Sequence, residues 1–102
     1  MPTIKGNDIH KVIVACDAGM GSSVMLASQL RRQLKGHAVT VEHKPVNEIP
    51  ADADVVVVHS GLADRARASA PGTVIVPVQV FLGDPAVNTL INAVKTGSEL
   101  NG

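Results

Sequence analysis

Aromatic side chains are almost absent from this sequence. Its 102 residues contain no Trp, no Tyr and a single Phe, Phe81. Proteins that bind single-stranded nucleic acid stack bases on aromatic rings, and this chain lacks such a platform. Lys plus Arg and Asp plus Glu number nine each, so the formal net charge is zero, and there is no basic run to follow a phosphate backbone. We therefore expect no nucleic-acid partner.

Long apolar runs and paired cysteines are also missing. The apolar stretches, such as the valine run 55–58, are far shorter than the roughly 20 residues that a membrane-spanning helix needs. The first residues lack the apolar core of a signal peptide, and a lone cysteine excludes an internal disulfide. We therefore expect a cytoplasmic chain. We also expect one globular domain, because the chain is too short for two cores of normal size.

What the sequence does contain is an alternation of short valine-rich strands with helices. The predicted strands cover residues 10–16, 39–46, 54–59 and 73–78, and the predicted helices cover about 22–35, 62–69 and 85–94. Strands continuous in valine are typical of a sheet buried on both faces. The order of elements predicts an α/β fold, a three-layer sandwich whose four-stranded, largely parallel, Rossmann-like sheet is flanked by helices.

The ends of these elements carry their own signals. Ser22 or Ser23 is expected to cap the first helix, Gly36 to end it, and Asp84 with the following proline to open the last helix. The second strand alternates apolar and polar residues, which places it near an edge of the sheet. A single helical turn around residues 47–49 is expected to carry the crossover into the third strand.

The two ends of the chain are expected to lie outside the fold. Residues 1–9 are polar and aperiodic, which is typical of a flexible leader or linker. The domain itself is expected to cover residues 10–97, followed by a short tail at 98–102.

The segment 16–23 is the strongest candidate for chemistry. It follows a predicted strand and precedes a helix, which is where ligands bind in open α/β sheets. Two glycines let backbone N–H groups converge on an anion, the helix N-terminus adds partial positive charge, and two serine hydroxyls can donate hydrogen bonds. The predicted phosphate-binding loop consists of Cys16, Asp17, Ala18, Gly19, Met20, Gly21, Ser22 and Ser23.

Cys16 is the candidate nucleophile of this loop. A thiol at the rim of an anion-binding loop has its pKa held below the usual value, so it is a thiolate near neutral pH. Such a thiolate can accept a phosphoryl group in line, without a metal. His59 ends the third strand at the same sheet edge and is a possible auxiliary residue that donates a proton or a hydrogen bond, or else a strand-end histidine that faces solvent.

The remaining candidates are of other kinds. Met20 and Met25 are expected to serve in packing or in docking to a partner. The other histidines show no metal-ligand spacing, so neither a metal nor a cofactor is proposed.

Several classes of phosphate-binding protein can be compared with this loop. A nucleotide P-loop requires Gly-Lys-Ser/Thr at the helix start, and no lysine follows Gly21. A low-molecular-weight tyrosine phosphatase has Cys-x5-Arg-Ser, but here Ser22 occupies the arginine position. Without a guanidinium, a stable phosphocysteine that awaits another acceptor is the better interpretation. An anion-binding regulatory module, with Cys16 as a bystander, remains an alternative.

Residues 12–25, Val-Ile-Val-Ala-Cys-Asp-Ala-Gly-Met-Gly-Ser-Ser-Val-Met, resemble a known phosphorylation loop. It is that of the enzyme IIB domains of the bacterial phosphoenolpyruvate-dependent sugar phosphotransferase system, mannitol type. The resemblance covers about residues 10–95 and continues through Leu30, Arg31, Ile49, Pro50, the strand 54–59, Leu62, Arg65, Ala66, Phe81 and Leu82. One departure is Ser60, where mannitol-type members tend to carry Arg.

The resemblance implies a phosphotransferase role for this chain. Cys16 would accept phosphate from a phosphohistidine on a IIA domain and pass it to mannitol held by the membrane-embedded IIC domain. The chain would then be a monomer in isolation, associated with the inner face of the membrane through IIC. Galactitol- and ascorbate-type IIB domains have a similar loop, so the sugar or hexitol stays open at this point.

Overall fold

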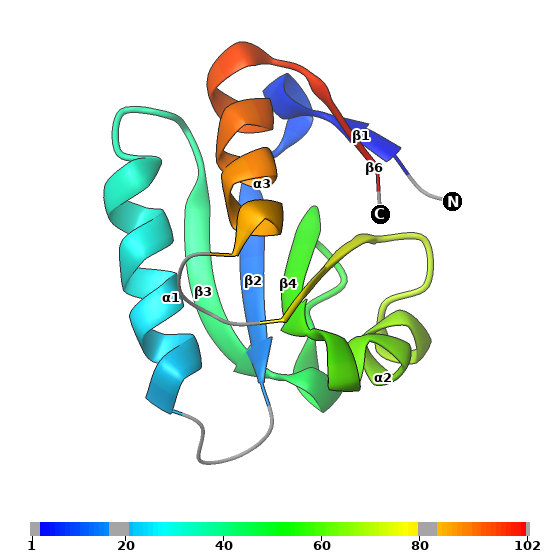
Figure 1. Cartoon of the computed structure of the whole chain (residues 1–102). Helices are drawn as coiled ribbons and strands as arrows, with labels where there is room; N and C mark the ends of the chain where they lie inside the picture. Colours follow the sequence, from blue (N-terminus) through cyan, green and yellow to red (C-terminus); the bar gives the residue numbers. More distant parts are fainter. Residues whose placement is uncertain (1–2, 17–20, 80–83, 102) are drawn as a thin grey trace.

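The computed structural model describes residues 3–16, 21–79 and 84–101. Its main sheet comprises β2 (Lys11–Cys16), β3 (Thr40–Pro45), β4 (Val55–His59) and β5 (Val74–Val78). The strands are all parallel and lie in the order β3-β2-β4-β5 (Figure 1). The predicted parallel sheet is therefore confirmed, and so is the edge position of the strand with alternating polarity.

Helices cover both faces of this sheet (Figure 1). One face is covered by α1 (Gly21–Gln33) and α3 (Pro85–Thr96). On the opposite face lie α2 (Ala63–Ser69) and two single-turn 3-10 helices, η2 (Val46–Glu48) and η3 (Ser60–Leu62). Because side chains alternate along a strand, Val12 and Val14 pack with α1 and α3, whereas Ile13 and Ala15 pack with α2 and η2. The predicted three-layer sandwich is confirmed, as is the single helical turn in the crossover.

The helix ends agree with the sequence signals in part. Asp84 caps α3, because its carboxylate accepts a hydrogen bond from the backbone N–H of Ala86 at 2.8 Å. After α1 the chain turns through Gly36, whose φ of 92° is in the left-handed region that favours glycine. The predicted cap at Ser22 or Ser23 is wrong: α1 begins at Gly21, so both serines lie inside its first turn. The difference is small, because helix ends fray and their assigned positions vary by one or two residues.

The ends of the chain are part of the fold, in contrast to the expectation for residues 1–9 and 98–102. Strand β1 (Thr3–Lys5) pairs antiparallel with β6 (Glu99–Asn101), and the 3-10 helix η1 (Gly6–Asp8) follows β1. Leu100 joins the α1–α3 core, and Ile9 is only 2% exposed. The expectation is therefore wrong for residues 3–9 and 99–101.

Close backbone packing holds this terminal pair in place. The N–H of Gly6 donates to the carbonyl of Ser98 at 2.8 Å. A Cβ atom on Gly6 would clash with the carbonyl oxygen of Ala93 in α3, so this position has no room for a side chain. The polar composition of residues 1–9 gave no sign of this packing, because it depends on contacts with distant residues such as Ala93 and Ser98.

Ion pairs and hydrogen bonds gather at the amino end of the main sheet. The Asp54 carboxylate accepts hydrogen bonds from the backbone N–H groups of His10 and Lys11, which ties the start of β4 to that of β2. The Lys11 ammonium lies 3.0 Å from Glu42 and 3.1 Å from Asp52. Hydrogen bonds to these two carboxylates raise the pKa of Lys11 above its ordinary value of 10.5, and the bond to Glu42 has the larger effect.

Candidate functional site

The carboxyl ends of β2 and β4 lie side by side at one edge of the main sheet. Ala15 pairs with Val58, so Cys16 and His59 follow at the next position on neighbouring strands. Neighbouring strands are about 4.8 Å apart. The strand order reverses here, because β3 lies on one side of β2 whereas β4 and β5 lie on the other. In open parallel sheets, the crevice beyond such a switch point is where ligands bind.

The predicted loop connects this edge to α1. Cys16 is the last residue of β2, and Gly21, Ser22 and Ser23 form the start of α1. The rest of the predicted loop, Asp17, Ala18, Gly19 and Met20, lies outside the described residues. The first turn of α1 carries no acidic side chain, so no carboxylate there offsets the positive end of the helix dipole. The backbone on both sides of 17–20 thus has the strand-to-helix arrangement of an anion site.

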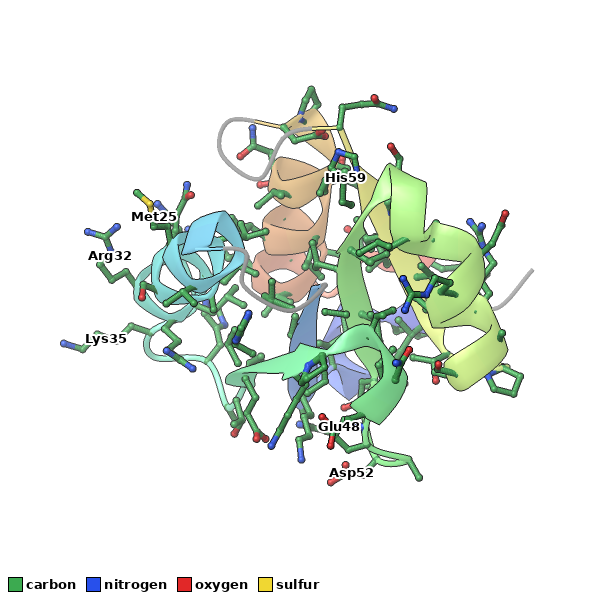
Figure 2. All side chains as sticks on the ribbon, turned by 90° about the horizontal axis from the view of Figure 1, so that it is seen from below. Met25, Arg32, Lys35, Glu48, Asp52 and His59 are labelled. Carbon is green, nitrogen blue, oxygen red and sulfur yellow. The ribbon has the colours of Figure 1, made fainter. Side chains whose placement is uncertain are left out.

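His59 is half-buried at the end of β4, on the edge that faces the viewer in Figure 2. Its Nδ1 accepts a hydrogen bond from the backbone N–H of Gly61 at 3.1 Å. A neutral imidazole whose Nδ1 is an acceptor carries its hydrogen on Nε2. His59 therefore lies at the sheet edge where the sequence predicts it. The hydrogen bond from Gly61 favours the tautomer with the hydrogen on Nε2.

Asp84 has a second role that the sequence analysis missed. Besides capping α3, its carboxylate accepts a hydrogen bond from the backbone N–H of Gln79 at 2.7 Å, and the residue is only 8% exposed. It therefore joins the end of β5 to the start of α3, at the same sheet edge as His59. The pair Asp-Pro signals a helix cap, but no local spacing signals the bond to Gln79.

An apolar patch lies on α1, close to the predicted loop. Val24 and Met25 are 49% and 58% exposed and line a shallow depression with Ser28, Gln29 and Arg32. Figure 2 shows Met25 and Arg32 on the outer side of α1, away from the sheet. Of the two roles expected for Met25, this exposure favours docking over packing, because its side chain contributes little to the core.

The described residues contain neither a cluster of metal-ligand side chains nor a helix that could span a membrane. Within 3–16, 21–79 and 84–101, no group of three or more His, Cys, Asp or Glu side chains is placed to hold a metal ion. In the same part of the chain, none of the helices has the length and apolar character needed to cross a membrane.

Comparisons with known proteins identify relatives of this chain. The family model described as "PTS system, Lactose/Cellobiose specific IIB subunit" matches residues 11–93. A mannitol-specific EIICB component of the phosphotransferase system from Halalkalibacterium halodurans is 39% identical over 90% of this chain. The mannitol-specific EIICB component of Bacillus subtilis is 43% identical over 85% of this chain. A mannitol-specific EIICBA component of Vibrio cholerae is similar to 82% of it at 43% identity.

These relatives are much longer proteins. The chain spans 20% of the Halalkalibacterium protein, 19% of the Bacillus protein and 13% of the Vibrio protein. The matched region nevertheless runs from the first residue of β2 into α3, and so takes in the main sheet and the sheet edge that carries Cys16 and His59. On this evidence the chain belongs to the IIB family of the phosphotransferase system.

Proposed function

We propose that this chain is the phosphoryl carrier of a mannitol phosphotransferase system, and that Cys16 bears the phosphate. One observation carries the proposal: in a chain of the IIB family, Cys16 ends β2 at the switch point of the sheet, and the amino end of α1 begins five residues later. Residues 16–23 form the phosphate-binding loop in this proposal. The positive end of α1 and the loop N–H groups stabilise charge on the phosphoryl oxygens.

The chemistry consists of two successive transfers. In the first, the Cys16 thiolate forms an S–P bond while the P–N bond of a phosphohistidine on IIA breaks, and the electron pair of that bond returns to the imidazole nitrogen. In the second, a mannitol hydroxyl forms an O–P bond while the S–P bond breaks. The hydroxyl proton goes to a base, and the thiolate is regenerated for the next cycle.

The choice of mannitol rests on the relatives. The family model is described by lactose and cellobiose, whereas the EIICB and EIICBA relatives, at about 40% identity, are named mannitol-specific. Because their similarity covers 82–90% of this chain, we assign it to the mannitol type. Their names also join the C and B components in one protein, which supports a membrane IIC partner and a place at the inner face of the membrane.

The IIA partner is supported by the surface of α1. Val24 and Met25 expose apolar area at the end of α1 that is nearest to Cys16. A phosphoryl donor must approach the thiolate closely and then leave, so its contact surface has to surround the loop. Methionine suits a transient interface, since its flexible side chain adapts to a partner.

The direct test is the intact mass of the chain after incubation with phosphoenolpyruvate, the general donor proteins and a mannitol-type IIA domain. We expect one acid-stable, iodine-labile phosphate on the wild type and none on Cys16→Ser. Adding membranes that contain the mannitol IIC domain should then release the phosphate to mannitol. The proposal fails if Cys16→Ser still carries phosphate to the sugar, or if the wild type takes up none.

A further inference from the structure

His59 lies on the same side of the main sheet as α1. Along β4, Val55 and Val57 belong to the core beneath α1 and α3, whereas Val56 and Val58 face α2. Continuing this alternation, position 59 is on the α1–α3 side. Position 16 is its neighbour on β2, one step beyond the pair Ala15 and Val58. His59 and Cys16 therefore occupy neighbouring positions on the same side of the sheet, at the edge where the predicted loop begins.

The turn after β4 selects one form of the imidazole. The Gly61 N–H points at Nδ1 from 3.1 Å, so Nδ1 must offer its lone pair. A hydrogen on Nδ1 would face the Gly61 hydrogen, so Nε2 is the atom that carries the proton. The turn also lies close to the ring, because a Cβ atom on Gly61 would be only 3.3 Å from Nδ1. His59 thus presents a fixed N–H donor at Nε2.

A donor of this kind suits the chemistry of a carrier. Residues 16–23 contain no Lys or Arg, so the loop itself supplies no side-chain cation to a phosphoryl dianion. A guanidinium or ammonium would bind the phosphate through strong charge-assisted hydrogen bonds. A neutral imidazole N–H stabilises the phosphoryl oxygens less, which leaves the group easier to transfer onward.

We propose that the Nε2–H of His59 donates a hydrogen bond to the phosphoryl group on Cys16, and that the Gly61 N–H holds the ring in the required tautomer. This inference rests on the proposed function, because it requires phosphate on Cys16. It assigns two different tasks to the two ring nitrogens. Nδ1 is an acceptor for the turn, and Nε2 is a donor to the phosphate.

Two substitutions separate these tasks. The amide NH2 of His59→Gln reaches about the place of Nε2 and keeps a donor there. The oxygen of His59→Asn lies near the place of Nδ1, keeps the acceptor for Gly61 N–H and removes the donor. The measurement is the equilibrium constant for phosphoryl exchange between IIA and Cys16, obtained from intact masses at fixed mixing ratios. We expect a loss of about tenfold in His59→Asn and a loss below about threefold in His59→Gln.

Other outcomes overturn the inference. If His59 only caps the turn, His59→Asn behaves as wild type and His59→Gln is the defective variant. Equal behaviour of the two variants also contradicts a donor at Nε2. If the wild type takes up no phosphate at all, the proposed function has failed instead, so the two failures are distinguishable.

A measurement on the wild type avoids any effect of substitution on folding. Long-range 1H–15N spectra of the histidine rings should show Nε2 protonated and Nδ1 unprotonated in His59, with the Nε2 signal moving when Cys16 is phosphorylated. His10 and His37, near the opposite sheet edge, are internal controls whose signals should stay in place. An unchanged His59 Nε2 signal, or a ring protonated at Nδ1, would rule out the proposed contact.

Discussion

The carboxylate of Asp84 accepts a hydrogen bond from the backbone N–H of Gln79 at 2.7 Å, across the connection from β5 to α3. Its other oxygen caps α3 by accepting from Ala86 at 2.8 Å. One buried side chain thus accepts hydrogen bonds from two backbone donors, one just after β5 and one in the first turn of α3. Losing the carboxylate would leave both N–H groups without this acceptor, and a buried donor without a partner costs stability.

We predict that Asp84→Ala lowers the free energy of unfolding by about 2–3 kcal/mol, since it removes a helix cap and a second buried hydrogen bond. Urea denaturation followed by circular dichroism measures the change. The matched control is Asp64→Ala, because Asp64 is a fully exposed acidic residue in the first turn of α2. The control should change stability by less than about 0.5 kcal/mol. Equal losses of unfolding free energy in the two variants would show that the hydrogen bonds of Asp84 do not stabilise the fold.

Substitution of the apolar patch on α1 should slow phosphoryl uptake without changing the fold. We predict that Met25→Asp reduces the rate of transfer from IIA to Cys16 about tenfold, which is typical of losing an apolar anchor of an interface. Rapid quenching followed by intact mass measures this rate. Gln33→Asp, an exposed position at the far end of the same helix, is the control and should retain the wild-type rate. A normal rate in Met25→Asp would place the donor elsewhere.

Lys11 should make stability depend on pH at the alkaline end. Its hydrogen bonds to Glu42 and Asp52 raise its pKa in the folded chain above 10.5. The ammonium therefore stabilises the fold fully below pH 10.5, and this contribution is lost as the pH rises through the folded pKa. We predict that wild type exceeds Lys11→Met in stability at pH 8 and that the difference shrinks above pH 10.5. Denaturation curves at several pH values measure it, with exposed Lys95→Met as the control. A difference that stays constant with pH would contradict the prediction.

The main sheet was predictable because its signal is local. Each inner strand is a run of valine and isoleucine, and burial on both faces of a parallel sheet requires such a run. The cap of α3 was predictable for the same reason, since Asp84 and Pro85 are adjacent in the chain. The two glycines and two serines after Cys16 predict an anion-binding loop, and this stays a prediction because residues 17–20 lie outside the described residues.

The features that were missed depend on contacts between distant parts of the chain. Strand β1 is only three residues long and exists by pairing with β6, so Thr3, Ile4 and Lys5 carry no pattern of their own. Gly6 is needed because α3 passes close to it, which no neighbouring residue reveals. His59 was predicted at the correct edge, but the choice between its ring nitrogens follows from a turn hydrogen bond with Gly61.

The pairing of β1 with β6 brings the two ends of the described chain together. Thr3 lies opposite Asn101, so the polypeptide enters and leaves at one place, near the amino ends of the strands, while Cys16 lies at their carboxyl ends (Figure 1). A link to a larger protein at either end of the chain would therefore lie at the opposite end of the strands from Cys16. Because the two ends are adjacent, attachment at both of them would leave the edge that bears Cys16 uncovered by the linking segments.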